Sequence, residues 1–327
     1  MGAYHAGSLA VQEQRGVRDR AEHVGRSLGQ DIKPVAAAFL ELQPLLMVGA
    51  ADPETGRVWT SALTGTPGFV RATGLRQMSV VTDTDTGRGG RPEGEGGCVR
   101  CAATAVRARA AHAHGNPHSR DGLQDPLATA LKTPGTHLGT IALDPRTRRR
   151  MRLNGRLRPT PRGFAVEADQ VFSNCPRYIQ RRESYETVTD RTPGTPRLLT
   201  ELGSHEREFI RSADTFFLAT VHPGGADVSH RGGNAGFVQV ASPTGLTWPD
   251  YPGNAMFLTL GNLRTDPRAG LLFLDWTTGD TLQLTGEAHA DIAAGGLRFT
   301  LTQALWTPAA LPLRWSAPEY SPANPPG

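Results

Sequence analysis

Cysteine is scarce in this sequence, with three residues among 327. That number excludes a disulfide scaffold and favours a reducing compartment. Apolar runs of about 18 residues, which a membrane-spanning helix needs, are also lacking. The first twenty residues contain no uninterrupted apolar core, so they predict no secretory signal. We therefore expect a cytoplasmic protein with no membrane partner and, at this length, two domains.

Several catalytic signatures are missing as well. The chain has no dinucleotide-binding glycine fingerprint and no P-loop, and no Ser-His-Asp order or His-Glu-x-x-His pattern stands out. An enzyme built on this sequence would therefore rely on a cofactor for its chemistry.

What the sequence does contain is a repeated, glycine-punctuated segment. "WTSALTGTPGFV" (59–70) matches "DVSHRGGNAGFV" (227–238) at an offset of 168 residues, and "GTIALDPRTRRRMRLNGR" (139–156) matches "GLLFLDWTTGDTLQLTGE" (270–287) at an offset of 131. The difference, 168 − 131 = 37, is the size of an extra segment in the first copy. The pattern predicts an internal duplication with one insertion.

Both copies have the composition of short strands. "PLLMVGAAD" and "TFFLATVHP" are apolar runs closed by turn residues, and residues 151–158 alternate apolar and polar side chains, as in a half-buried strand. The predicted fold class is mainly β with short helices, arranged as two tandem split β-barrels. We expect an N-terminal helical segment (1–35), a first barrel (36–182), a linker (183–203) and a second barrel (204–327).

The extra segment of the first copy lies at about residues 84–121 and is rich in Gly, Arg, Ala and His, which predicts a flexible insert. Its Cys98-x2-Cys101 pair and the later His114 and His118 match the spacing of a zinc finger. Between these ligands, however, a finger needs a small apolar core, and this segment offers alanines. We expect no metal, and the role of the pair stays open.

The longer motifs resemble those of the pyridoxamine 5'-phosphate oxidase-like, FMN-binding split-barrel proteins, in particular a long-chain branch with tandem barrels. The resemblance is carried by "DVSHRGGNAGFV", "YPGNAMFLTLGNLRTDPRAGLLFLD", "LQLTGEA", "TRRRMRLNGR" and "NCPRYIQRR". It implies two barrels packed side by side with FMN in the groove between them. A tandem chain would then supply both barrels itself, with a homodimer possible in addition.

The FMN phosphate is expected at the second copy, because a hydroxyl and a guanidinium two residues apart, Ser229 and Arg231, suit a phosphate. The first copy has Ala62 and Leu63 where the second has His230 and Arg231. Asn262 is a candidate cap for a helix that would point N–H groups at an anion. The family's lysine is absent, and an arginine would replace it. The full set of cofactor candidates is Ser229, His230, Arg231, Gly233, Asn254, Thr259, Asn262 and Arg268.

The predicted function is that of a flavin-dependent oxidoreductase, which takes a small-molecule substrate and an electron donor or acceptor. One alternative is a flavin or haem carrier, with His205, His230 or His289 as axial ligand. A less favoured alternative is a nucleic-acid-binding protein that uses the basic face formed by Arg152, Arg156 and Arg158. That face also suits a solvated surface or a positive wall beside an anion. "NCPRYIQ" is expected to close the cofactor groove.

Overall fold

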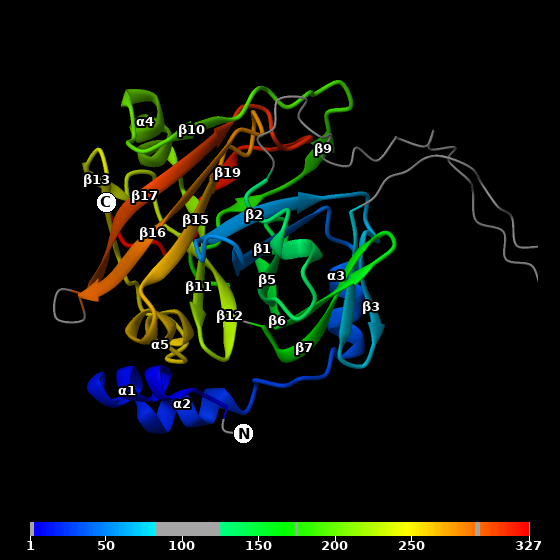
Figure 1. The fold of residues 1–327 in the computed structure, drawn as a ribbon. Helices are drawn as coiled ribbons and strands as arrows, with labels where there is room; N and C mark the ends of the chain where they lie inside the picture. Colours follow the sequence, from blue (N-terminus) through cyan, green and yellow to red (C-terminus); the bar gives the residue numbers. More distant parts are fainter. Residues whose placement is uncertain (1–2, 83–124, 174–175, 292–294, 327) are drawn as a thin grey trace, which may run out of the picture.

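The computed structural model describes residues 3–82, 125–173, 176–291 and 295–326 (Figure 1). The predicted insert at 84–121, with Cys98 and Cys101, lies outside the described residues, and so does Cys175.

The elements follow the chain in two comparable series. The first series is α1 (Ala6–Gln14), α2 (Arg18–Gly25), α3 (Pro34–Glu41), β1 (Leu45–Ala51), β2 (Val58–Thr64), β3 (Val70–Gly74), β4 (Gln77–Val81), the short 3₁₀ turn η1 (Ala130–Lys132), β5 (His137–Asp144), β6 (Arg149–Thr160), β7 (Gly163–Ser173), β8 (Arg181–Arg182) and β9 (Tyr185–Thr187). The second series is β10 (Arg197–Leu199), α4 (Ser204–Ser212), β11 (Thr215–His222), β12 (Gly225–Gly232), β13 (Gln239–Ser242), β14 (Gly245–Pro249), α5 (Leu258–Thr265), β15 (Arg268–Leu274), β16 (Thr281–Asp291), β17 (Gly296–Thr307), β18 (Leu313–Trp315) and β19 (Pro318–Glu319).

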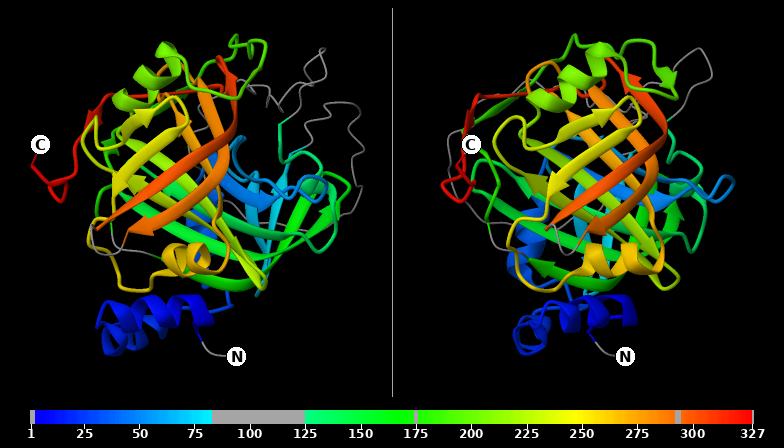
Figure 2. Two further views of the ribbon diagram at one scale, coloured as in Figure 1. Left: turned by 60° about the vertical axis from the view of Figure 1, so that its left-hand side comes forward. Right: turned by 90° about the vertical axis from the view of Figure 1, so that its left-hand side faces the viewer.

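The two large sheets have the same strand order. The first runs β2-β1-β5-β6-β7-β4-β3 and the second runs β12-β11-β15-β16-β17-β14-β13, with β10 added beside β17. All neighbouring strands pair antiparallel. Figure 2 shows the two curved sheets side by side. The predicted fold class, two tandem split barrels, is confirmed.

The repeated glycine turn has a packing reason. At Gly65 a Cβ atom would collide with the ring of Phe69, and at Gly233 it would collide with the ring of Phe237 in the same way. Each aromatic side chain therefore folds back onto the glycine four residues before it. A larger residue at the glycine would displace the ring, which is why both copies keep the same turn.

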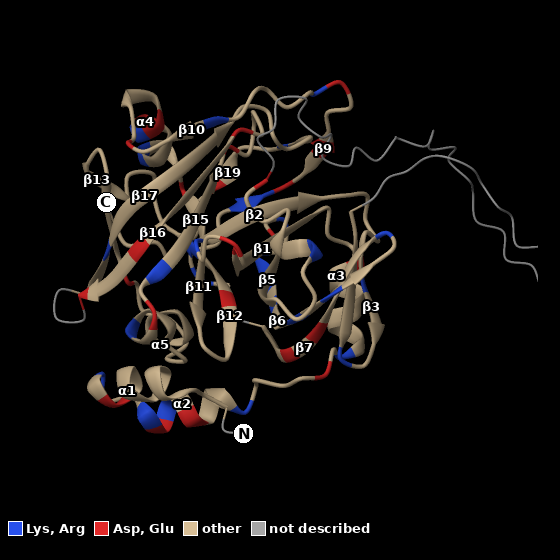
Figure 3. Cartoon of the chain, viewed as in Figure 1, with Lys and Arg blue, Asp and Glu red and all other residues tan. Residues whose placement is uncertain are grey.

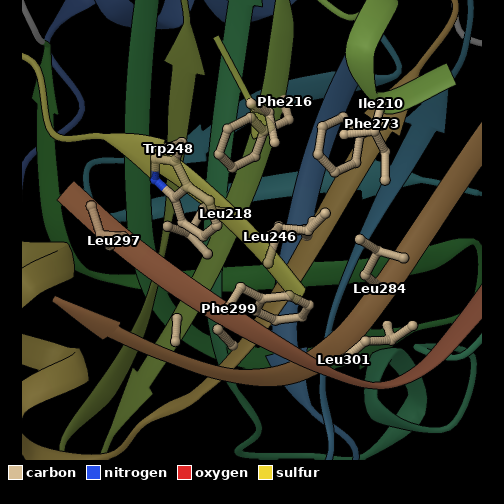
Figure 4. Packing of buried hydrophobic residues seen from close by; sticks show 14 of the residues in the cluster. Ile210, Phe216, Leu218, Leu246, Trp248, Phe273, Leu284, Leu297, Phe299 and Leu301 are labelled. Atoms are coloured by element: carbon tan, nitrogen blue, oxygen red, sulfur yellow. The ribbon is translucent and has the colours of Figure 1, made fainter. Parts of the chain in front are cut away.

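Each barrel has its own apolar core. In the second barrel the ring of Phe216 stacks on Phe273 at 5.1 Å and meets Trp248 edge-on at 5.2 Å (Figure 4). Leu284 and Phe299 close the same core and are fully buried. Full burial of one such side chain contributes about 1.5–3 kcal/mol, so these clusters are the main stabilising feature of each barrel.

A third apolar cluster joins the two barrels. Met47 and Ile141 of the first barrel meet Phe217, Val228 and Leu272 of the second, and all five side chains are fully buried. The strands that meet are β1, β2 and β5 on one side and β11, β12 and β15 on the other. The barrels therefore meet through a shared apolar cluster that is separate from their own cores.

The contact between the barrels is close to symmetric. A Cβ atom at Gly139 of β5 would lie 2.6 Å from the backbone of Asp227 in β12, and one at Gly270 of β15 would lie 2.7 Å from the backbone of Trp59 in β2. These two glycines are the pair that the sequence repeat matched. Both are needed for the same reason, because each lets a strand of one barrel pack directly on the backbone of the other.

Strand β6 departs from the predicted alternation. Residues 151–155 are all buried, including Arg152, whereas Arg156 and Arg158 are exposed. The face that was expected to meet solvent is covered by the second barrel along the first part of the strand. The predicted arginine face is therefore divided into one buried arginine and two exposed ones.

Charged residues of both signs are spread over the surface, for example on α2 and α4 (Figure 3). Within the described part of the chain, no helix combines the length and the apolar character that crossing a bilayer requires.

Candidate functional site

A cavity of about 380 Å³ lies where the two barrels and the N-terminal helices meet, which is within the size range of small-molecule sites. Its lining includes five arginines and one carboxylate, so its charge is positive. The first barrel and the segment that follows it contribute Arg150, Arg152, Phe172, Arg177 and Tyr178; the second barrel contributes His230, Arg231, Gly232, Phe237 and residues 249–251 and 253–260; α2 contributes Arg20 and Val24.

Arg152 crosses from one barrel to the other beside this cavity. Its Nη1 donates to Asp227 Oδ2 at 2.9 Å, and Asn154 Nδ2 donates to Asp227 Oδ1 at 3.0 Å. Burial lowers the pKa of the Arg152 guanidinium, and the charge of Asp227 opposes that effect. Arg152 Nε is buried and has no hydrogen-bond partner among the described residues, so it is available to a ligand.

His230 is a buried, neutral imidazole. Arg150 Nη1 lies 3.0 Å from its Nδ1, and because a guanidinium can only donate, Nδ1 must accept and the proton sits on Nε2. Burial, reinforced by the charges of Arg150, Arg152 and Arg231, places the pKa of His230 well below its usual range. Its Nε2 has no partner among the residues that the structure describes. The side chain therefore offers a neutral N–H donor at the cavity.

Arg231, next along β12, forms an ion pair at the cavity wall. Its Nη1 donates to Asp250 Oδ1 at 2.9 Å. Its Nε is buried and, within the described chain, also lacks a partner. Arg231 therefore has one donor committed to the protein and another left for an anion.

The first turn of α5 faces the same cavity. Leu258, Thr259 and Leu260 all line it, and as the first three helical residues they have backbone N–H groups with no acceptor inside the helix. The N-cap, Phe257, provides no side-chain bond and has a left-handed backbone with φ 52°. A helix N-terminus without a cap, beside arginines, favours a phosphate or carboxylate group.

The described part of "NCPRYIQRR", residues 176–182, contributes to the cavity wall and holds the glycine turn. The ring of Tyr178 lies 5.1 Å from that of Tyr251, and its hydroxyl donates to Pro252 O at 3.0 Å. Gln180 Nε2 donates to Gly233 O at 3.0 Å, and Gln180 Oε1 accepts from Ser321 N at 2.7 Å. The segment thus ties the turn of the second barrel to the C-terminal residues.

Four of the eight predicted cofactor residues line the cavity: His230, Arg231, Asn254 and Thr259. Asn254 also shapes the segment before α5, because its Oδ1 accepts from Met256 N at 3.1 Å. The structure brings these four residues together from β12, the segment before α5 and α5 itself.

The other four predicted residues lie elsewhere. Ser229 is buried, with its hydroxyl 3.4 Å from Leu218 O, and the C-terminal end of β12 presents His230 together with Arg231 instead. Gly233 lies in the turn. Asn262 lies inside α5 and not at its cap. Arg268 is half exposed and pairs with Asp266.

The sequence did not identify Arg150, Phe172 or Tyr251 as cavity residues. Arg150 and Arg152 belong to a basic strand whose pattern matched a surface strand equally well. Only the position of the second barrel makes them cavity residues, and no local signal in β6 contains that information. Tyr251, in contrast, stands inside the quoted motif beginning "YPGNAM", so the motif itself marked its neighbourhood.

A bound metal or haem would need ligand side chains at the same cavity. The described residues contain no cluster of three or more His, Cys, Asp or Glu side chains suited to a metal. Of the three haem-ligand candidates, His230 lines the cavity, His205 packs against Trp306 at 4.6 Å, and His289 is exposed beside Glu287.

The second barrel matches a known family. The family model described as "Pyridoxamine 5'-phosphate oxidase" matches residues 202–295, which include β11 to β16 and the cavity residues of that barrel. No curated protein matches the chain.

Solved structures give weak matches to about a third of the chain. HupZ of Group A Streptococcus is 12% identical, with 31% of this chain and 89% of that one covered and a TM-score of 0.25. A FAD-binding protein of Mesorhizobium loti is 12% identical, with 35% and 96% covered and a TM-score of 0.26. The FAD-binding protein of Mycobacterium smegmatis is 13% identical, with 35% and 98% covered and a TM-score of 0.25. Likenesses at this level carry no argument about function.

The family match covers most of the second barrel, from α4 to β16, and the first barrel repeats the strand order of the second. Residues 202–295 are therefore similar to the pyridoxamine 5'-phosphate oxidase family, and the duplication extends the same strand order to the first barrel.

Proposed function

We propose that this protein binds FMN in the cavity between its barrels and acts as a flavin-dependent oxidoreductase on a small molecule. The observation that carries the proposal is a set of buried donor atoms with no partner among the described residues: Arg152 Nε, His230 Nε2 and Arg231 Nε. All three belong to residues that line one cavity. Buried polar atoms are rarely left unpaired, so such a group is best explained by an anionic ligand.

The residues present suit the two ends of a flavin nucleotide. Arg231, Arg152 and the first turn of α5 supply donors for a phosphate, while Phe172, Phe237 and Tyr178 supply apolar and aromatic surface. When bound, FMN supplies hydride and electron transfer. The protein orients the cofactor and excludes water, and His230 holds a proton at Nε2 as a neutral donor. The substrate, the electron partner and the reducing, cytoplasmic location stay part of the proposal.

A haem carrier is the alternative that His230 would serve, because it is the candidate axial ligand at the cavity. An axial histidine binds iron through an unprotonated ring nitrogen. Here Arg150 donates to Nδ1, which leaves the proton on Nε2 and no free lone pair. The geometry of His230 therefore favours FMN over haem as the ligand of this cavity.

A nucleic-acid partner that used the predicted basic face of β6 would need its two exposed arginines, Arg156 and Arg158, to be free. Arg156 Nε lies 3.5 Å from Asp169 Oδ2, and Arg158 Nη2 lies 3.8 Å from Glu167 Oε2. Carboxylates from β7 thus offset the positive charge of this face, which favours a small-molecule partner over a polyanion.

The test is FMN retention. Purified protein is incubated with FMN, desalted and examined for flavin absorption, beside Arg231→Ala and the control Arg158→Ala. We expect the wild type and the control to retain flavin and Arg231→Ala to retain much less, because its guanidinium lines the cavity whereas Arg158 is exposed on β6.

Absence of flavin from the wild type would refute the proposal. Equal retention by both variants would place the cofactor somewhere else. A haem spectrum in place of a flavin spectrum would favour the carrier alternative.

A further inference from the structure

We propose that the N-terminal helix pair, α1 and α2, is a positioning element that holds residues 250–258 in the conformation that binds the ligand. The inference rests on the proposed FMN site and deepens it, because it names what sets the affinity of that site. In Figures 1 and 2 the pair lies beside α5, at the edge of the second barrel.

The segment that the pair contacts has a strained backbone. Ala255 and Phe257 have left-handed conformations, with φ values of 64° and 52°, and neither is glycine. A non-glycine residue in this sparsely populated region is strained, and such a conformation persists only where surrounding contacts hold it. The segment leads directly into the first turn of α5, so its shape decides where the N–H groups of that turn point.

Gln12 of α1 supplies such a contact. Its Nε2 donates to Met256 O at 3.0 Å, and both residues are almost completely buried. Met256 lies between the two left-handed residues. The hydrogen bond therefore fixes the carbonyl at the centre of the strained segment.

Two arginines extend the contact to both ends of the segment. Arg20 Nη2 donates to Gly253 O at 3.3 Å. Arg15 Nη2 lies 3.9 Å from Asp250 Oδ2, and its guanidinium carbon lies 6.0 Å from the centre of the Phe257 ring. Asp250 is the carboxylate that pairs with Arg231, so the helix pair also touches the charged wall of the cavity.

The pair is fixed to the barrel at separate places, which allows it to act as a brace. Gly7 of α1 and Gly261 of α5 lie so close that a Cβ atom on either would collide with the other helix. Nε2 of His5 is 2.9 Å from Oδ1 of Asn262, and the His5 ring stacks on the ring of His222 with 4.3 Å between the ring centres. This gives Asn262 a role in anchoring α1, which differs from the helix cap that the sequence suggested.

If the pair positions the segment, ligand and brace must be coupled in both directions. Loss of the brace should weaken binding, and binding should protect the segment and the pair together. A helix pair that only adds stability would lower the melting temperature without changing the affinity of the cavity.

The experiment uses the full-length protein with FMN as the probe. The variant is Gln12→Met, which keeps the side-chain volume and removes the donor, with Gln12→Ala as a second variant. The control is Arg18→Ala, because Arg18 is exposed on the same pair and contacts Glu13. FMN affinity is measured by fluorescence titration, and amide hydrogen exchange of residues 250–258 is measured without FMN.

We expect the Gln12 variants to bind FMN about tenfold more weakly, as loss of a buried hydrogen bond implies, and to exchange faster at residues 250–258. The control should match the wild type in both measurements. Unchanged affinity and unchanged exchange in Gln12→Met, whatever its melting temperature, would overturn the inference. If the wild type binds no FMN, the proposed function fails, and the exchange measurement alone tests whether the helix pair holds residues 250–258. Faster exchange in the Gln12 variants would support that role, and unchanged exchange would overturn it.

Discussion

Two histidines form an uncharged stack between the N-terminus and the second barrel. The rings of His5 and His222 lie 4.3 Å apart and 11° from parallel. Gly7 N donates to His5 Nδ1, and Gly224 N donates to His222 Nδ1, so each ring is held neutral with its proton on Nε2. Protonation of both rings would break these two bonds and place two cations in contact.

The stack predicts a loss of stability in acid. Burial lowers the pKa of His222 from 6.5 to about 4, with a further lowering by His5 and His137 and an opposing effect of Asp227, and burial also lowers the pKa of His5. Because the folded state binds these protons less readily than the unfolded state, the stabilisation is complete above pH 6.5 and falls as the pH drops toward 4.

The measurement is the melting temperature of the wild type and of His222→Asn between these pH values. Asparagine keeps an acceptor for Gly224 N but does not titrate there. We expect acidification to lower the melting temperature of the wild type by more degrees than that of the variant. Parallel curves would show that the stack does not titrate in this range.

At the scale of the element, both barrels are bent at the same point by a β-bulge. The pairing of β6 with β7 shifts register between Asn154 and Gly155, and the pairing of β16 with β17 shifts between Thr285 and Gly286. A Cβ atom at either glycine would collide with a carbonyl oxygen of the neighbouring strand. The two glycines are therefore required by the curvature of the sheets, not by the ligand.

Substitution at these bulges should be costly and similar in the two copies. We expect Gly155→Ala and Gly286→Ala each to lower the free energy of unfolding by about 1–3 kcal/mol, as overpacking does in a close-packed site. Gly253→Ala is the control, because a Cβ atom there meets no atom within 4 Å. Urea denaturation followed by intrinsic fluorescence measures the change. A loss in the control as large as in the bulge variants would contradict the explanation.

The elements could largely be predicted from local sequence, whereas the site could not. The runs "PLLMVGAAD" and "TFFLATVHP" contain β1 and β11, because apolar β-formers between turn residues leave few alternatives. Arg152 shows the limit of such reasoning. The alternation of its strand fits a solvated face. The Arg152 side chain is buried only because Asp227 of β12, 75 residues further along the chain, packs against it. The internal repeat and the family motif both marked His230, but neither showed which neighbours would surround it.

At the scale of the whole molecule, the duplication places a second, equivalent position on the opposite side of the contact between the barrels. The register of the paired strands makes Gln283 of β16 the counterpart of Arg152, and both reach across to the other barrel: Arg152 to Asp227, and Gln283 Nε2 to Thr60 O at 3.0 Å. The resemblance between the barrels therefore extends to the polar contacts that join them.

The chemistry of the second position is different. Thr281 and Gln283 take the places of Arg150 and Arg152, and Ala62 and Leu63 take those of His230 and Arg231. A half-buried acid lies there instead: Asp125 Oδ1 accepts from Ser61 Oγ at 2.7 Å, and burial raises the pKa of its carboxyl. None of these counterpart residues is an arginine that could bind an anionic phosphate. The phosphate would instead lie near the carboxyl group of Asp125.

This asymmetry predicts one FMN for each chain, although the fold has two equivalent positions. Titration of the protein with FMN, followed by flavin fluorescence at protein concentrations well above the dissociation constant, should break at a molar ratio of one. The variant Arg152→Gln, which copies the residue at the second position, should weaken binding, since it removes a buried guanidinium from the cavity wall. A break at a ratio of two would mean that the arginines are not what selects the site, and that the backbone frame common to both barrels is sufficient to hold the flavin.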